Sequence, residues 1–280
     1  MSELIHMRQR IKAVGTIKKV THAMRLISMA SHAKLRTQRD HFEQYNKELN
    51  RLLMNMQSSY PEWHYPIESN PNAERHLAII VGSQKGLCGN FNNAIVGFFA
   101  RQFSHVDPNL IDTIIVGKKA IELLAAKKSP TIMEFKVFTP NTLPSITQKI
   151  SDYLLAHSHE YQSLTLCAQY PKSFFVQRPV AHTLSEPPHR FGQPFAAQEP
   201  YHWEHQPLEF FTMLTQNYLQ KKIYFVLLNS LIAEQAARFI AMDSSTRNAA
   251  TMLDDLRIDY NKLRQAKITR ELTDLVGSFF

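Results

Sequence analysis

The sequence has few chain-breaking residues, and nearly all of them lie in its middle. All 14 prolines and six of the eight glycines fall from residue 61 to residue 207. The first 60 residues contain only Gly15, and after Pro207 the next glycine or proline is Gly277. Because these residues interrupt helices, we predict long helices over 1–60 and 208–280 and a folded domain over 61–207. A helix over the last segment would be about 100 Å long.

Cysteines and long apolar runs are also scarce. Cys88 and Cys167 have neither the spacing of a zinc site nor that of a disulfide framework, so we expect two buried thiols in a reducing compartment. The longest uninterrupted apolar run, "IYFVLL", is much shorter than the ~20 residues of a membrane span. The N-terminal stretch lacks the pattern of a secretory signal. We therefore expect no direct membrane insertion.

The net charge of +8 is concentrated near the N-terminus. Nine lysines and arginines lie between Arg8 and Arg39 with no acidic residue among them. Nucleic acid, a membrane surface or an acidic protein could accept such a helix. The segment has no aromatic residue that could stack on bases, and its apolar stripe is moderate for a helix lying on a membrane. An acidic protein surface is therefore favoured, and no nucleic acid is expected.

Both end segments carry apolar residues at helical spacing. The first stripe comprises Leu4, Met7, Ile11, Val14, Ile17, Val20, Met24 and Ile27. The second comprises Ile232, Ala236, Phe239, Leu253, Leu256, Tyr260, Leu263, Ile268, Leu272 and Leu275, and the polar stretch "DSSTRNAAT" interrupts it. A helix of this length needs a partner along its side. The two ends are predicted to form an irregular antiparallel coiled coil.

The middle alternates between strand-like and helix-like segments. Strands are expected at 76–81, 112–116, 131–138, 163–169 and 174–182, and helices at 90–103, 118–127 and 143–159. This alternation predicts an α/β fold with a mostly parallel, Rossmann-like sheet. The stretch "KKIYFVLLNS" is rich enough in β-branched and aromatic residues for a strand. Its place in a long segment without breakers favours a helix.

No motif indicates catalysis, a cofactor or a metal. The loop "GSQKGLCGNFN" follows a strand and opens a helix, but its glycines fit neither phosphate-binding pattern, and Cys88 has no base beside it. His202 and His205 lack further ligands at zinc spacing. We expect no catalytic residue, no cofactor and no metal.

Three stretches resemble the gamma subunit of F-type ATP synthases, the central rotor stalk. They are "RIKAVGTIKKVTHAMRLISMASHAKLR", "KGLCGNFN" and the C-terminal stretch from "LLNSLIAEQAARFIAM" through "YNKLRQAKITRELTDLVGS". The resemblance implies an antiparallel coil inserted into a ring of alpha and beta subunits, with the α/β domain outside. It also implies contacts with the epsilon subunit and the membrane c-ring, and a non-catalytic role in coupling ion flow to ATP synthesis or hydrolysis.

The resemblance also indicates which residues make coupling contacts. Met24, Arg238, Gln265 and Thr269 match family positions associated with coupling, and the basic residues Lys18, Lys19, Arg25 and Arg264 are expected to face acidic loops of the beta subunits. The simpler interpretation is that Met24 packs in the coil and the polar residues lie on a solvated helix face. A bacterial complex at the cytoplasmic face of the inner membrane is expected.

Two other classes remain open at this point. A coiled-coil scaffold or nucleic-acid-binding protein with an α/β head would also use long helices and a basic segment. An α/β enzyme with helical extensions is the third possibility. Association with ATPase subunits separates the first interpretation from both.

Overall fold

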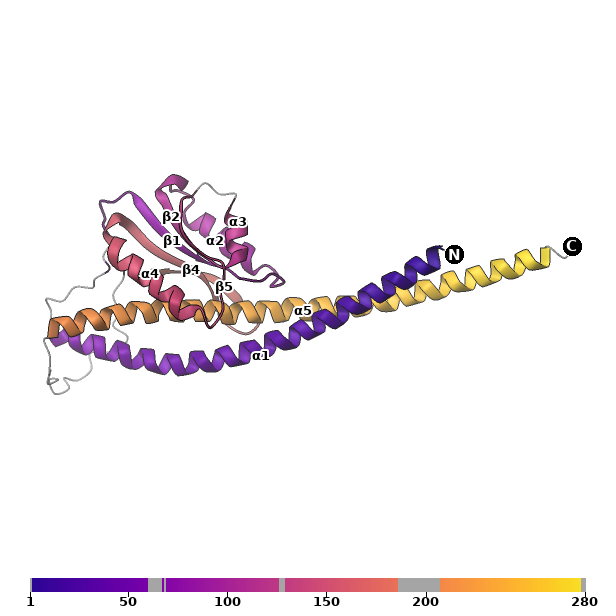
Figure 1. Ribbon diagram of the computed structural model, residues 1–280, viewed down its shortest axis with the longest axis horizontal. Coiled ribbons are helices and arrows are strands. Elements are labelled where there is room, and N and C mark those ends of the chain that lie inside the picture. The colour runs from indigo at the N-terminus through magenta and orange to yellow at the C-terminus, as the bar shows by residue number, and fades with distance from the viewer. Residues whose placement is uncertain (1, 60–66, 68, 126–128, 186–206, 278–280) are drawn as a thin grey trace. The chain divides into compact units, whose positions relative to one another are not determined.

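The structure is a computed structural model that describes residues 2–59, 67, 69–125, 129–185 and 207–277 (Figure 1). Its two longest elements are α1, Ser2–Ser59, and α5, Pro207–Gly277, which confirms the predicted end helices. The chain divides into two compact units, each described by itself below. The helix-pair unit comprises residues 1–30 and 238–280, and the sheet unit comprises residues 31–237.

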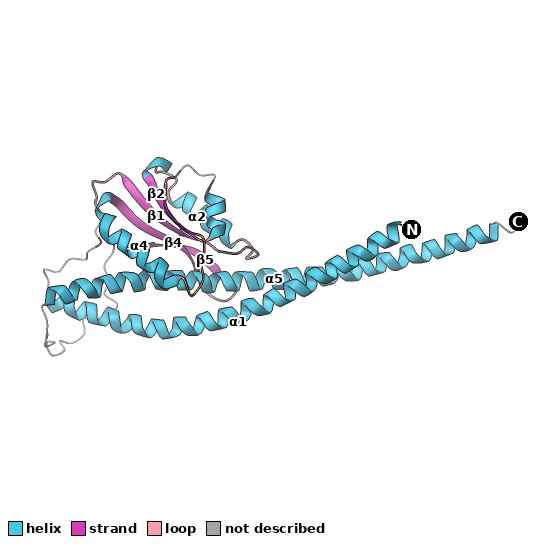
Figure 2. Ribbon diagram, in the orientation of Figure 1, coloured by secondary structure: helices cyan, strands magenta, loops and turns pink. Residues whose placement is uncertain are grey.

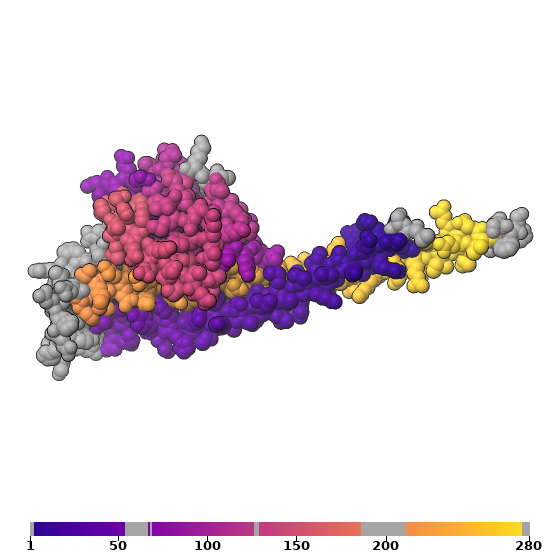
Figure 3. All heavy atoms as spheres, in the orientation of Figure 1, coloured from indigo at the N-terminus to yellow at the C-terminus, as the bar shows by residue number. Residues whose placement is uncertain are grey.

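In the helix-pair unit α1 and α5 are antiparallel. Arg8 of α1 donates a hydrogen bond to the hydroxyl of Tyr260 at 2.9 Å, whereas Arg25, further along α1, forms an ion pair with Asp243 at 2.6 Å. As residue numbers increase along α1, the residue numbers of its contacts on α5 decrease, so the two helices run in opposite directions. An apolar cluster joins the helices and comprises Met7, Ile11, Val14, Ala249, Leu253 and Leu256. Figure 3 shows the side chains of the two helices in contact along this unit.

Part of the predicted coil stripe does not face the partner helix. Val14 is 7% exposed, but Ile17, Val20 and Ile27 are 54%, 52% and 65% exposed. The three successive three-residue steps from Ile11 to Val20 fall short of the 3.6-residue turn, so Val20 is rotated about 120° from Val14. The prediction that these residues pack in the coil was therefore wrong.

The predicted packing of the α5 end was also wrong. Ile268, Leu272 and Leu275 are 43%, 58% and 56% exposed. Given the pairing of Arg8 with Tyr260, the described part of α1, which starts at Ser2, does not reach these residues.

The polar stretch of α5 replaces the missing apolar contacts. It is continuous helix, and its Thr246 donates a hydrogen bond to Thr21 of α1 at 2.9 Å. Asp243 pairs with Arg25 one turn earlier. The stretch "DSSTRNAAT" is thus the polar section of the helix contact and does not interrupt the helix.

The sheet unit holds five strands in the order β3-β2-β1-β4-β5. Figure 2 labels β1, β2, β4 and β5 of this sheet. The strands are β1 Arg75–Val81, β2 Ile111–Val116, β3 Thr131–Phe135, β4 Tyr161–Pro171 and β5 Gln177–Thr183. The pairs within β3-β2-β1-β4 are parallel, and β5 is antiparallel to β4. This confirms the predicted α/β class with a mostly parallel sheet.

Helices cover both faces of this sheet. Alternation along β1 sends Ala78 and Ile80 to the face covered by α2, Phe91–Gln102, and α3, Lys118–Leu124. Leu77, Ile79 and Val81 point to the other face, towards α4, Leu143–His157, and the first part of α5. Two short 3-10 helices, Pro108–Leu110 and Ser158–Glu160, precede β2 and β4.

The first part of α5 is a core helix of the sheet unit. "KKIYFVLLNS" is helical, as predicted, and Ile223, Leu227 and Leu228 are fully buried in the main apolar cluster. By length and composition α5 also contains a window that could cross a membrane, with 67% of that window buried inside the protein. The length of uninterrupted apolar runs in the sequence did not reveal this window, because polar residues are interspersed in it. Its burial is that of a helix packed in a protein core.

Three partly or largely buried histidines make the sheet unit sensitive to acid. Burial is the main cause that lowers the pKa of His32, His76 and His182 below the usual 6.5. Below about pH 6.5 these histidines therefore bind more protons in the unfolded chain than in the folded unit, and protonation favours unfolding. We expect the unfolding midpoint to fall as the pH drops below 6.5 and to be insensitive to these groups at pH 7–8. Replacing all three by Gln should flatten that pH dependence in thermal unfolding.

Candidate partner-contact surface

All eight predicted contact residues lie in the helix-pair unit, but they do not gather into one site. Met24 and Arg25 are half-buried next to the contact with Asp243. Arg238 is buried at 6% exposure, so it is not on a solvated face. The remaining five are exposed and lie at two separate levels, Lys18 and Lys19 on α1 and Arg264, Gln265 and Thr269 near the end of α5.

Exposed apolar residues lie beside these charges on α1. Ile17, Val20, Leu26 and Ile27 are each more than half exposed, and Lys18 and Lys19 lie among them in the chain. Of the described basic residues of α1 in this unit, only Arg25 forms an ion pair. Apolar side chains next to unpaired positive charge are typical of a surface that another molecule covers. We call Ile17–Ile27 of α1 the contact segment.

The apolar part of the contact segment could have been found from the sequence. The steps of three from Ile11 to Val20 are visible in the printed chain, and their rotation away from Val14 follows from helix geometry. Apolar residues that are rotated away from the partner helix must face either solvent or another protein, and this consequence of the spacing was missed.

The Arg25–Asp243 pair is a second feature that the sequence did not reveal. Asp243 accepts from Arg25 at 2.6 Å and pairs with Arg247 at 2.8 Å. The hydrogen bond from Arg25, followed by the charges of Arg247 and Arg25, lowers the pKa of the Asp243 carboxyl. The pair joins the two helices at the level of Met24.

We expect Asp243→Asn to weaken the pairing of the two helices. The effect should be non-additive with Arg25→Met in a double-mutant cycle of unfolding free energies. Because the folded pKa of Asp243 is lowered, the stabilisation is present above the usual carboxyl range and is lost only as the pH falls through the lowered value. Asp254→Asn is the control, since Asp254 pairs at 3.4 Å with Arg257 of its own helix. Fully additive cycles would contradict the assignment.

The loop after β1 is held by its own side chains. Asn92 accepts from the Ser83 amide at 2.9 Å and donates to the Ser83 hydroxyl at 2.8 Å and to the Cys88 sulfur at 3.3 Å. Cys88 is 2% exposed and packs with Phe91 and Ala233. Cys88 and Cys167 are both buried thiols, as predicted.

Metal ligands do not cluster in the part of the chain that the structure describes. Within it, no group of three or more His, Cys, Asp or Glu residues could hold an ion. His202 and His205 lie outside the described residues.

An antiparallel helix pair with exposed apolar and basic side chains, together with a unit built on a mostly parallel sheet, defines an α/β protein with long terminal helices. A family model described as ATP synthase matches residues 3–279. The chain is 28% identical to the ATP synthase gamma chain of Ehrlichia chaffeensis, over 100% of this chain and 99% of that one. It is also 28% identical to the gamma chain of Rickettsia typhi, over 99% and 98%. The chain therefore belongs to the ATP synthase gamma-chain family.

The fold agrees with this assignment. A chain of the mitochondrial ATP synthase of Euglena gracilis superimposes with a TM-score of 0.64 and 13% identity, over 99% of this chain and 94% of that one. As a gamma chain the protein is a non-catalytic subunit, the central stalk of an F-type ATP synthase. It is a peripheral component of a membrane-associated complex. The scaffold and nucleic-acid alternatives are not favoured.

Proposed function

We propose that the helix-pair unit enters a hexamer of alpha and beta subunits and that the contact segment bears on the beta subunits. The observation that carries this proposal is the presence of exposed apolar residues in the contact segment together with Lys18 and Lys19, which have no ion-pair partner among the described residues. Unpaired positive charge favours acidic loops on the partner. Weak attraction spread over several residues would hold a turning stalk without locking it at one angle.

In this proposal the eight predicted residues divide into exposed groups that contact the partner and residues that support them. Lys18, Lys19 and Arg264 supply exposed charge, and Gln265 and Thr269 supply polar groups near the end of α5. Arg25 and Met24 support the contact segment from the side facing α5. Buried Arg238 supports the first turns of α5 in this unit and is proposed as a positioning residue.

The outer arrangement is part of the same proposal. We propose that residues 61–207 form the domain outside the hexamer, where the chain meets the epsilon subunit and the c-ring. We propose segments 1–60 and 208–280 as the two coiled-coil parts. We propose that the complex lies at the cytoplasmic face of a bacterial inner membrane, and the bacterial source of the relatives named above supports this.

The test is assembly with alpha and beta subunits of the same source. A tagged chain should co-purify with three copies of each, and the complex should hydrolyse ATP. Lys18→Glu with Lys19→Glu should weaken coupling between hydrolysis and ion transport more than Lys149→Glu, an exposed control on α4. Purification of the tagged chain without alpha and beta subunits would overturn the proposal.

A further inference from the structure

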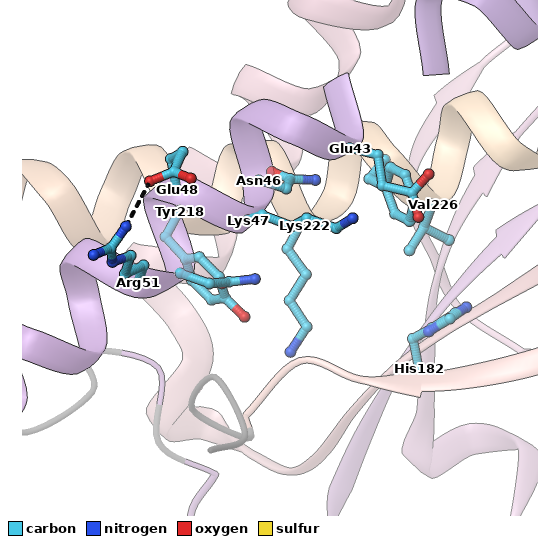
Figure 4. Close-up of a pocket in the computed structure, with 11 residues that line it drawn as sticks. Glu43, Asn46, Lys47, Glu48, Arg51, His182, Tyr218, Lys222 and Val226 are labelled. Carbon is cyan, nitrogen blue, oxygen red and sulfur yellow. Dashed lines mark ion pairs between the residues drawn. The ribbon is translucent and has the colours of Figure 1, made fainter. Parts of the chain in front are cut away.

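A groove of about 730 Å³ opens in the sheet unit between α1, α5 and β5 (Figure 4). Its walls come from three elements that are distant in sequence. The lining residues are Glu43, Asn46, Lys47, Glu48, Asn50, Arg51, His182, Tyr218, Lys222, Phe225 and Val226. A volume of this size is typical of small-molecule sites, which range over roughly 300–1,000 Å³.

The apolar part of the groove comes from α5. Phe225 and Val226 lie about two turns after Tyr218 on that helix, and Val226 is 5% exposed in the main apolar cluster. Most of the lining surface is apolar. This part of the groove can accommodate the aromatic or aliphatic portion of a ligand.

The polar part of the groove favours negative charge. Lys222 extends between α5 and β5 and donates to the carbonyl of Thr183 at 3.1 Å, which holds its ammonium group at the groove (Figure 4). Lys47 supplies a second positive charge from α1. Glu48 is paired with Arg51 at 3.8 Å, which leaves Glu43 as the one unpaired acid among the described lining residues. Burial and the charge of Lys222 lower the pKa of His182, so its ring is neutral at pH 7.

We propose that this groove binds a small amphipathic anion, a molecule with an apolar body and one carboxylate or sulfonate group. The apolar body lies against Tyr218, Phe225 and Val226, and the anionic group lies between Lys222 and Lys47. Three walls and a mixed lining favour a small molecule over the flat surface of a protein partner. The proposal does not rest on the contact segment, because none of the groove residues lies in the helix-pair unit.

Dodecanoate is the probe, and isothermal titration of the purified full-length chain is the measurement. We expect saturable binding of one molecule per chain. Dodecanol and acetate should each bind more weakly, because one lacks the charge and the other lacks the apolar body. Lys222→Met and Lys47→Met should each weaken dodecanoate binding by about tenfold, as expected for the loss of a charge-assisted contact. Lys262 is an exposed residue of α5 in the helix-pair unit, and Lys262→Met should leave the affinity for dodecanoate unchanged.

Four results would overturn the proposal. They are the absence of saturable binding, equal affinity for dodecanol, unchanged affinity in both lysine variants, and loss of binding when the chain is assembled with its partner subunits. The last result would show that a protein surface fills the groove. Lys47 is exposed on α1, so its replacement tests the site even if Lys222→Met disturbs the packing against β5.

Discussion

Leu256→Pro should abolish ATP-driven ion transport while leaving the sheet unit folded. Leu256 is 6% exposed and packs in the apolar cluster that joins α5 to Val14 of α1. Proline there removes a helical hydrogen bond and clashes with the preceding turn, at a cost of about 3 kcal/mol or more. A stalk broken at this level cannot transmit torque along its length. Ion uptake by inverted membrane vesicles measures the loss, and circular dichroism follows the sheet unit.

Matched replacements separate lost packing from a broken helix. Leu256→Met keeps volume and helix and should cost less than about 1.5 kcal/mol, with transport retained. Leu256→Ala should cost about 2–5 kcal/mol, whereas Ile258→Ala, at a side chain that is 53% exposed, should cost about 0.5 kcal/mol or less. Normal transport in the Leu256→Pro variant would contradict the role of a rigid α5.

Gly117→Val should prevent the sheet unit from folding. Gly117 follows β2 with φ of 99°, in the left-handed region that disfavours side chains. A Cβ atom at this position would lie 2.5 Å from the carbonyl oxygen of Gly82 and 2.8 Å from that of Ser83. Both obstacles are backbone atoms that cannot move away without disturbing β1. We expect a loss on the order of 4 kcal/mol or more in chemical unfolding, or no soluble protein.

Gly97→Ala is the matched control in the same unit. Gly97 lies inside α2, and a Cβ atom there meets nothing within 4 Å. Alanine in a helix interior is favoured over glycine by about 0.5–1 kcal/mol, so this variant should be slightly more stable. Equal effects of the two replacements would show that the strain at Gly117 has been misjudged.

The sequence predicted the elements of the fold well and their faces less well. The gap in glycine and proline after Pro207 was sufficient to place α5, including "KKIYFVLLNS", because no breaker could end a helix there. The strand order and the antiparallel β5 required knowledge of long-range pairing, which a pattern of apolar residues does not contain. The expected strand starting at residue 174 begins at Gln177, after the turn that follows Pro171.

For the contact surface, too, the sequence indicated some residues correctly and assigned others to the wrong face of their helix. Lys18 and Lys19 were identified by family resemblance and are exposed, whereas Ile17 and Val20 were assigned to the coil and lie outside it. The assignment failed because a spacing of three was treated as equivalent to a turn of 3.6 residues. The burial of Arg238 depends on packing that no local pattern specifies. The anion groove combines residues from α1, α5 and β5, so only the folded chain brings it together.

The central claim is that this chain turns inside its complex as ATP is hydrolysed. The direct measurement is single-molecule rotation of a reconstituted complex with alpha and beta subunits. Phe175→Cys places a label at a side chain that is 74% exposed in the sheet unit, since both native cysteines are buried. A bead attached there should rotate in one direction only when ATP is present. ATP hydrolysis by the fully assembled complex with a stationary bead would contradict the account.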